Sequence, residues 1–312
     1  MSALVLLAFA GATVTAATPE EPPAVAKPAP TPVEEVVVSA PEPRYVAPTT
    51  RDRIGRIWAP VLINGKGPYR LVLDTGASRS AVTRAVAEEL GVPIRRNAIR
   101  LRGATGSATV DAVRVDTLEV GDLLIDGTTL PIVGDAFGGA QGVLGGEGLG
   151  DKRIVIEFRK DRISIRRSNR ERAPAGYSVV PFRFGAHHGM RIEVTVGRLK
   201  AVGLIDTGAQ VTVGNSALRE ALMRRRPDDL APTEDIVGVT EDVQQADTLR
   251  IPSIVAGELI VRRAPIKFSD LAIFEYWKLH REPALLVGMD VLGVLDTLVI
   301  DYRLRELQVR TR

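Results

Sequence analysis

Two aspartates in this sequence occupy the same short motif. Each follows an apolar run and precedes Thr-Gly-Ala, at Asp74–Ala77 and at Asp206–Ala209. A glycine after Asp-Thr permits backbone angles closed to other residues, so backbone N–H groups can turn towards the carboxylate. If the two motifs meet, two carboxylates at hydrogen-bonding distance cannot both ionise easily and share one proton. Such a pair can act as general base and general acid on a bound water.

The composition leaves few other groups for catalysis. The chain of 312 residues contains 38 Asp plus Glu, three His and no Cys. The absence of cysteine excludes thiol nucleophiles, disulfides and Cys-rich zinc sites. The glycine-rich run at 138–146 lacks the Gly-Lys-Ser/Thr of a phosphate loop, and no Gly-x-Ser-x-Gly motif occurs. The adjacent His187 and His188 are predicted to be solvated in a turn, so we expect no metal site and no cofactor.

The charge balance argues against a nucleic-acid partner. The 41 Lys plus Arg nearly cancel the acidic residues, and the formal net charge is +3. Basic clusters such as Arg224–Arg226 have no interleaved aromatic residues. We therefore expect no nucleic acid to bind.

The elements that must position the two aspartates repeat along the chain. In each copy an apolar strand leads into the Asp, and a short helix, a hairpin and an apolar pair ending in glycine follow. Those glycines are Gly145 and Gly288. Each copy closes with a hairpin, at 154–166 and 298–310. The sequence therefore predicts two copies of one mostly β unit, at residues 54–167 and 177–312.

The two copies differ in two places. The second is longer between its Asp and its glycine, and the extra length falls in the stretch Leu271–Leu285, which holds Trp277. The first copy reads Gly-Gly-Glu-Gly-Leu over Gly145–Leu149 where the second reads Gly-Met-Asp-Val-Leu over Gly288–Leu292, and its extra glycines are expected to weaken a short helix there.

The repeated unit resembles the retropepsin-like branch of the aspartic proteases. The resemblance depends on the two Asp-Thr-Gly-Ala motifs and on two downstream motifs, Val143–Gly145 and Leu286–Gly288, and it covers about residues 54–312. It implies a mostly β, bilobal, pseudo-two-fold acid-protease fold with a short helix in each lobe. The chain is similar to bacterial-type exported members in which both halves are fused. We therefore expect one monomer to hold a complete site.

The resemblance also implies roles for individual residues. Asp74 and Asp206 would be the catalytic pair, in an aspartic endopeptidase that hydrolyses a polypeptide with an activated water and needs no metal or cofactor. The implied supporting residues are Thr75, Gly76, Thr207 and Gly208. The implied substrate-binding flaps contain Gly103, Ala104, Thr105 and Gly106 in the first copy and Gly238, Val239 and Thr240 in the second. The alternative is a catalytically inactive peptide-binding or scaffold module that keeps the fold.

The N-terminal residues predict export. An apolar run from Ala3 to Val14 ends in small residues, which is typical of a signal peptide over residues 1–17. We expect a periplasmic or secreted protein, with an uncleaved N-terminal anchor as the alternative. Residues 18–50, rich in Pro and Ala, are expected to be a disordered linker or a pro-segment. No later run is long enough to predict a membrane span.

Overall fold

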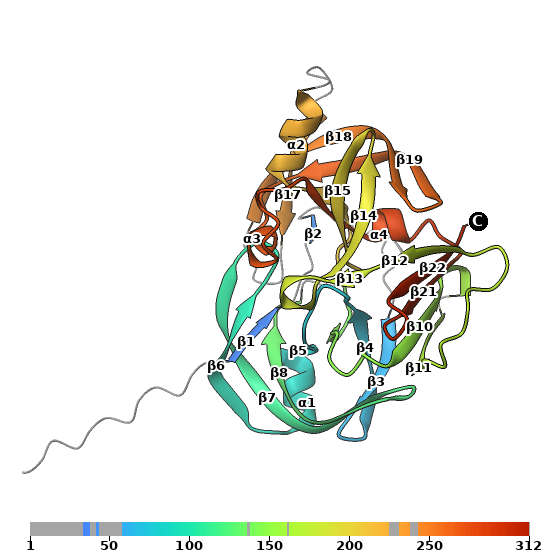
Figure 1. The fold of residues 1–312 in the computed structure, drawn as a ribbon. Coiled ribbons are helices and arrows are strands. Elements are labelled where there is room, and N and C mark those ends of the chain that lie inside the picture. The colour runs from blue at the N-terminus through green and yellow to red at the C-terminus, as the bar shows by residue number, and fades with distance from the viewer. Residues whose placement is uncertain are drawn as a thin grey trace, which may run out of the picture. The chain divides into compact units, whose positions relative to one another are not determined.

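The computed structural model is built from β-strands that close into two barrels (Figure 1). The structure describes residues 58–135, 138–160, 162–224 and 246–311, with the backbone of the strand residues 34–37, 42–43, 231–237 and 243–245. Val33–Arg312 form one unit and Met1–Pro32 another. Among the described residues, no helix has the length and apolar character needed to cross a membrane.

The first barrel has the strand order β7-β3-β4-β9-β5-β8 and closes by the pairing of β7 with β8. Its strands are β3 (Trp58–Ile63), β4 (Lys66–Leu73), β5 (Ala81–Thr83), β7 (Ser107–Val120), β8 (Leu123–Val133) and β9 (Gly142–Leu144). Two strands extend its sheet, β6 (Ile94–Arg102) beside β7 and β1 (Glu34–Val37) beside β6. Helix α1 (Arg84–Leu90) follows β5 and ends where Gly91 adopts a φ of 70°.

The second barrel has the order β14-β15-β20-β16-β19-β18 and closes by the pairing of β14 with β18. Its strands are β14 (Met190–Val196), β15 (Leu199–Ile205), β16 (Val213–Gly214), β18 (Val243–Ala256), β19 (Leu259–Phe268) and β20 (Ala284–Val287). The sheet continues into β17 (Ala231–Val237), β2 (Glu42–Pro43) and β13 (Arg183–Phe184). Its helices are α2 (Ser216–Met223), α3 (Ala272–Tyr276) and α4 (Met289–Leu292).

The two barrels correspond strand by strand. In the first, β4 pairs parallel with β9, β9 antiparallel with β5, and β5 parallel with β8. In the second, β15, β20, β16 and β19 repeat that series of parallel and antiparallel pairings. The predicted mostly β, bilobal, pseudo-two-fold fold is confirmed.

The sequence accounts for the local form of the helices. Asn215 caps α2, because its side-chain Oδ1 accepts a hydrogen bond from the Leu218 N–H at 2.9 Å.

The short helix after Gly145 that was expected to be weak does not form in the first lobe. Residues 145–150, all of them described, form turns where the second lobe forms α4. The second lobe therefore has more helix than the single short one expected.

A third sheet joins the two lobes (Figure 1). Its order is β11-β10-β21-β22-β12, with β10 (Lys152–Glu157) and β11 (Arg162–Arg167) from the first lobe and β12 (Ser178–Pro181), β21 (Thr297–Asp301) and β22 (Glu306–Arg310) from the second. β10 and β21 pair antiparallel about Val155 and Val299. The hairpins that close the two repeats thus share one sheet.

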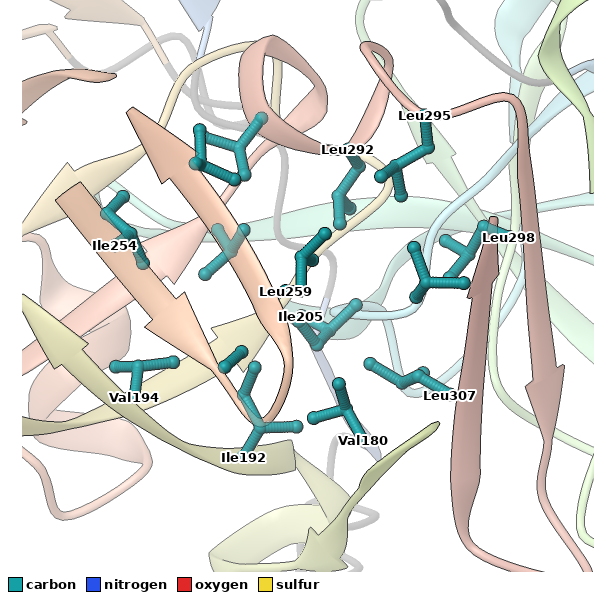
Figure 2. Close-up of a pocket in the computed structure, with 15 residues that line it drawn as sticks. Val180, Ile192, Val194, Ile205, Ile254, Leu259, Leu292, Leu295, Leu298 and Leu307 are labelled. Atoms are coloured by element: carbon teal, nitrogen blue, oxygen red, sulfur yellow. The ribbon is translucent and has the colours of Figure 1, made fainter. Parts of the chain in front are cut away.

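The core of the second lobe contains a small apolar cavity of about 30 Å³. Figure 2 shows side chains from several strands and from α4 around it, among them Ile192, Val194, Ile205, Leu292 and Leu307. A space of this size holds no organic ligand, so the cavity is a packing feature of the barrel.

Candidate active site

The two aspartates lie at equivalent strand ends. Asp74 follows β4, and its N–H donates to the Leu144 carbonyl at 2.9 Å; Asp206 follows β15, and its N–H donates to the Val287 carbonyl at 3.1 Å. Both aspartates are fully buried. The parallel pairings of β4 with β9 and of β15 with β20 therefore fix where each Asp leaves its barrel.

Backbone N–H groups hold each carboxyl in the same way. Asp74 Oδ1 accepts from the N–H of Gly76 at 2.8 Å and of Ala77 at 3.0 Å. Asp206 Oδ1 accepts from the N–H of Gly208 at 2.9 Å and from the next N–H at 3.1 Å. One oxygen of each carboxyl is thus occupied by the loop, which orients the carboxyl group.

The threonines of the two motifs link the lobes. Thr75 Oγ1 accepts from the Thr207 N–H and donates to the Ile205 carbonyl at 2.7 Å. Thr207 Oγ1 accepts from the Thr75 N–H and donates to the Leu73 carbonyl at 2.7 Å. These four buried hydrogen bonds are related by the pseudo-two-fold axis, and they fix the spacing of the two Asp loops.

The two carboxyls interact directly. Burial, the charge of Asp206 and a hydrogen bond between the two carboxyls raise the pKa of Asp74 well above its ordinary value of 3.8. The N–H groups of Gly76 and Ala77 act in the opposite direction and are outweighed. A pair in this state keeps a proton at pH values at which an isolated Asp has already lost it.

Gly208 is required by the close approach of the two loops. A Cβ at this position would lie 2.4 Å from Asp74 Cγ and 2.5 Å from Asp74 Oδ2. Any larger residue would push the carboxyl of the opposite lobe out of place.

A second pair of acidic side chains braces the Asp loops, and the sequence interpretation missed it. Asp290 Oδ1 accepts from Thr212 Oγ1 at 2.7 Å, and Thr212 Oγ1 accepts from the Gly288 N–H at 3.1 Å. In the first lobe Glu147 Oε1 accepts from the Ser80 N–H at 2.6 Å, and Ser80 Oγ accepts from the Gly145 N–H at 3.1 Å. Burial raises the pKa of both acids.

A signal for these braces was present in the sequence. Glu147 and Asp290 each stand two positions after the repeated glycine, and Ser80 and Thr212 each stand six positions after the repeated Asp. The first lobe thus has Glu147 at the position where the second lobe has Asp290. With this longer side chain the first lobe keeps the contact to Ser80, although it forms no helix equivalent to α4 there.

Comparison with known families gives one match. A family model described as aspartyl protease matches residues 59–147, which span the first barrel, Asp74 and Glu147. Over these residues the first lobe is similar to the retropepsin-like aspartyl proteases. No curated protein matches the chain. The match supports a protease-type function.

The first predicted flap is a tight hairpin loop. It connects β6 to β7, and the Gly103 N–H donates to the Gly106 carbonyl at 2.8 Å. Ala104 is fully buried and Thr105 nearly so. The second predicted flap, Gly238, Val239 and Thr240, lies outside the described residues.

A cavity of about 310 Å³ is lined by residues of both lobes. Its lining includes Thr75, Gly76, Ala77 and Glu147 from the first lobe and Phe184, His187, His188, Met190 and Tyr302 from the second. Burial and the charge of Asp74 raise the pKa of Tyr302. The cavity thus lies beside the Asp74 loop, and most of its lining is apolar.

The two histidines lie in a short 3-10 turn, Ala186–His188, and both are exposed. The His187 ring stacks on Tyr276 with centroids 3.9 Å apart. Within the described part of the chain, no cluster of three His, Asp or Glu side chains could hold a metal ion.

Proposed function

We propose that this protein is an aspartic endopeptidase in which Asp74 and Asp206 activate a water to hydrolyse a peptide bond. The observation that carries the proposal is the pair of fully buried carboxyls, each held by two backbone N–H groups of matching loops. Burial and the charge of Asp206 raise the pKa of Asp74. The family match of the first lobe supports the same reaction class.

The mechanism follows from a proton shared by the pair. The ionised carboxyl takes a proton from the bound water, and the water oxygen bonds to the peptide carbonyl carbon. The protonated carboxyl donates its proton to the carbonyl oxygen, which gives a neutral tetrahedral diol. A hydroxyl proton then returns to one carboxyl, the other carboxyl protonates the nitrogen, and the C–N bond breaks. The pair ends with one proton, as it began, so its pH dependence belongs to both residues together.

The fixed loops explain how the pair can work without rearranging. Each carboxyl has one oxygen held by two N–H groups, and the threonine bonds keep the loops in register. Preorganised groups of this kind lower the barrier because they do not reorient during the reaction. The cavity beside Thr75–Ala77 offers space for a side chain of an extended polypeptide.

The test is cleavage of an unfolded polypeptide by the full chain and by two isosteric variants, Asp74→Asn and Asp206→Asn. We expect each variant to lose at least ~10³-fold in kcat, since the residues act as a unit. Asp116→Asn is the matched control, because Asp116 is exposed in the first lobe. Equal cleavage by the wild type and both variants would exclude the proposed mechanism. Binding of the polypeptide without cleavage by the wild type would favour the inactive peptide-binding module.

A mixing experiment tests whether one chain forms the complete site. Asp74 and Asp206 belong to lobes of one chain, whose threonines hydrogen-bond to each other. A mixture of the Asp74→Asn and Asp206→Asn variants should therefore stay inactive, and the active wild type should have the mass of a monomer by light scattering. Recovery of activity on mixing would show that lobes of different chains pair.

A further inference from the structure

The segment between β19 and β20 departs from the pseudo-two-fold symmetry. Residues 269–283 connect these strands and form α3, whereas residues 134–141 make the equivalent connection in the first lobe and form no helix in their described part. This is the extra length seen in the sequence at Leu271–Leu285. Because the fold closes without it in the first lobe, the insertion is free to serve another purpose.

The insertion touches the flap of the opposite lobe. The Ile273 N–H donates to the Ala104 carbonyl at 3.3 Å. Ala104, at the tip of the first flap, is fully buried in an apolar cluster that includes Phe274 and Trp277. Ala209, three residues after Asp206, belongs to the same cluster. The flap tip is thus packed into the second lobe next to an Asp loop.

A second contact lies at the base of the flap. The Arg102 guanidinium lies over the Tyr276 ring, 5.1 Å from its centroid, and the His187 ring stacks on Tyr276. Arg102 is the last residue of β6, and His187 lines the cavity beside the Asp74 loop. Tyr276 of α3 therefore connects the flap to the cavity wall.

The insertion itself is fixed to the second lobe. Asn215 Nδ2 donates to the carbonyls of Leu279 and Glu282, both at 2.8 Å. Arg191 of β14 donates to the Trp277 carbonyl, and the Ser216 N–H of α2 donates to Asp270 Oδ1 at 2.9 Å. Since residues before and after α3 are bonded to the second lobe, movement between flap and insertion must come from the flap.

We propose that α3 is a latch that holds the first flap against the second lobe, so that a polypeptide reaches the Asp pair after Ala104 leaves the apolar cluster. The latch rests on the proposed function for its effect on cleavage, but its effect on flap opening can be measured without activity. The partner of the first flap is therefore α3, which has no counterpart in the described part of the first lobe.

Hydrogen exchange of the flap tests the latch directly. In Tyr276→Ala the contact to Arg102 is lost, and the Gly103 N–H, which is hydrogen-bonded to Gly106, should exchange about tenfold faster. Tyr177→Ala is the matched control. It also removes a tyrosine ring under an arginine, since Arg310 lies 5.5 Å from the Tyr177 ring centroid in the sheet between the lobes. Equal flap exchange in the wild type and in Tyr276→Ala would overturn the latch.

A reversible disulfide cross-link provides the second test. Because the natural chain has no cysteine, the two introduced thiols can pair only with each other within the chain. Ala104→Cys combined with Ile273→Cys places two thiols on adjacent backbones. Oxidation should reduce the cleavage of an unfolded polypeptide at least tenfold, and a reductant should restore it, while either single variant stays insensitive to oxidant. Equal cleavage by the oxidised and reduced forms would overturn the latch. If no form cleaves but flap exchange responds to Tyr276→Ala, the latch stands and the proposed function fails.

Discussion

At the scale of single residues, each Asp carboxyl is held by backbone N–H groups of its own loop, and polar side chains brace that loop. The sequence singled out the two aspartates, because an unusual motif occurred twice. It did not locate Ser80, Thr212, Glu147 and Asp290, because each brace joins residues far apart in the chain and the two braces use different side chains. It also could not show how Gly208 faces Asp74 across the lobes. That approach depends on the packing of two loops, and no local pattern encodes it.

The raised pKa of Asp74 predicts a pH-dependent stability. Since the folded state binds this proton more tightly than the unfolded chain, the free energy of unfolding falls as pH rises from about 3.8 through the folded pKa. Each unit of the raised pKa corresponds to about 1.4 kcal/mol. Asp74→Asn removes this titration, so its stability relative to the wild type should increase from acid to neutral pH.

Urea unfolding at a series of pH values measures this difference. Asp116→Asn, at an exposed site, should follow the wild-type curve throughout. Parallel curves for Asp74→Asn and the wild type would mean that Asp74 has an ordinary pKa in the folded protein.

At the scale of elements, the sequence predicted the strands and the helices α1 and α2 because each has a local signature, but it did not predict α3. β14 alternates buried and more exposed residues, and Asn215 and Gly91 mark helix ends. The contact between α3 and the first flap was not predictable in the same way. The sequence showed an insertion, but where an insertion packs depends on the arrangement of both lobes.

The cavity of the second barrel predicts the effect of changing side-chain volume. Val194→Ile adds one methylene beside a space of about 30 Å³ and should stabilise the protein by up to about 0.8 kcal/mol. Leu292→Ala enlarges the same space and should cost about 2–5 kcal/mol. Both changes are measured by denaturant unfolding. A loss of stability in Val194→Ile would show that the cavity cannot take the added group.

At the scale of the whole molecule, the sheet between the lobes keeps the two aspartates together. Its centre contains a buried ion pair, in which Arg153 donates to Asp301 Oδ2 at 3.0 Å and to Gln308 Oε1 at 2.7 Å. Asp301 also accepts from Ser168 Oγ at 2.9 Å. The sequence predicted the two hairpins of this sheet, but the pairing of Arg153 with Asp301 arises from the lobes being side by side.

Breaking this pair should weaken the whole fold. Asp301→Asn removes the nearest carboxylate from the buried Arg153 guanidinium, whose other carboxylate partner, Glu171, lies 3.8 Å away. The change should cost about 3–5 kcal/mol in the free energy of unfolding. The control is Asp111→Asn, which breaks the exposed contact with Arg84 and should change stability little. Similar losses in both variants would show that the buried Arg153–Asp301 pair contributes no more to the free energy of unfolding than an exposed pair.

The insertion at α3 has a consequence for how a peptide would lie in the cleft. In a fully symmetric pair of lobes, a chain bound from N to C and the same chain reversed meet identical surroundings. Here Tyr276 of the insertion stacks on His187, and the insertion also contacts the first flap. The described part of the equivalent connection in the first lobe forms no helix. The two orientations of a bound polypeptide are therefore inequivalent, and residues on either side of the broken bond should obey different preferences.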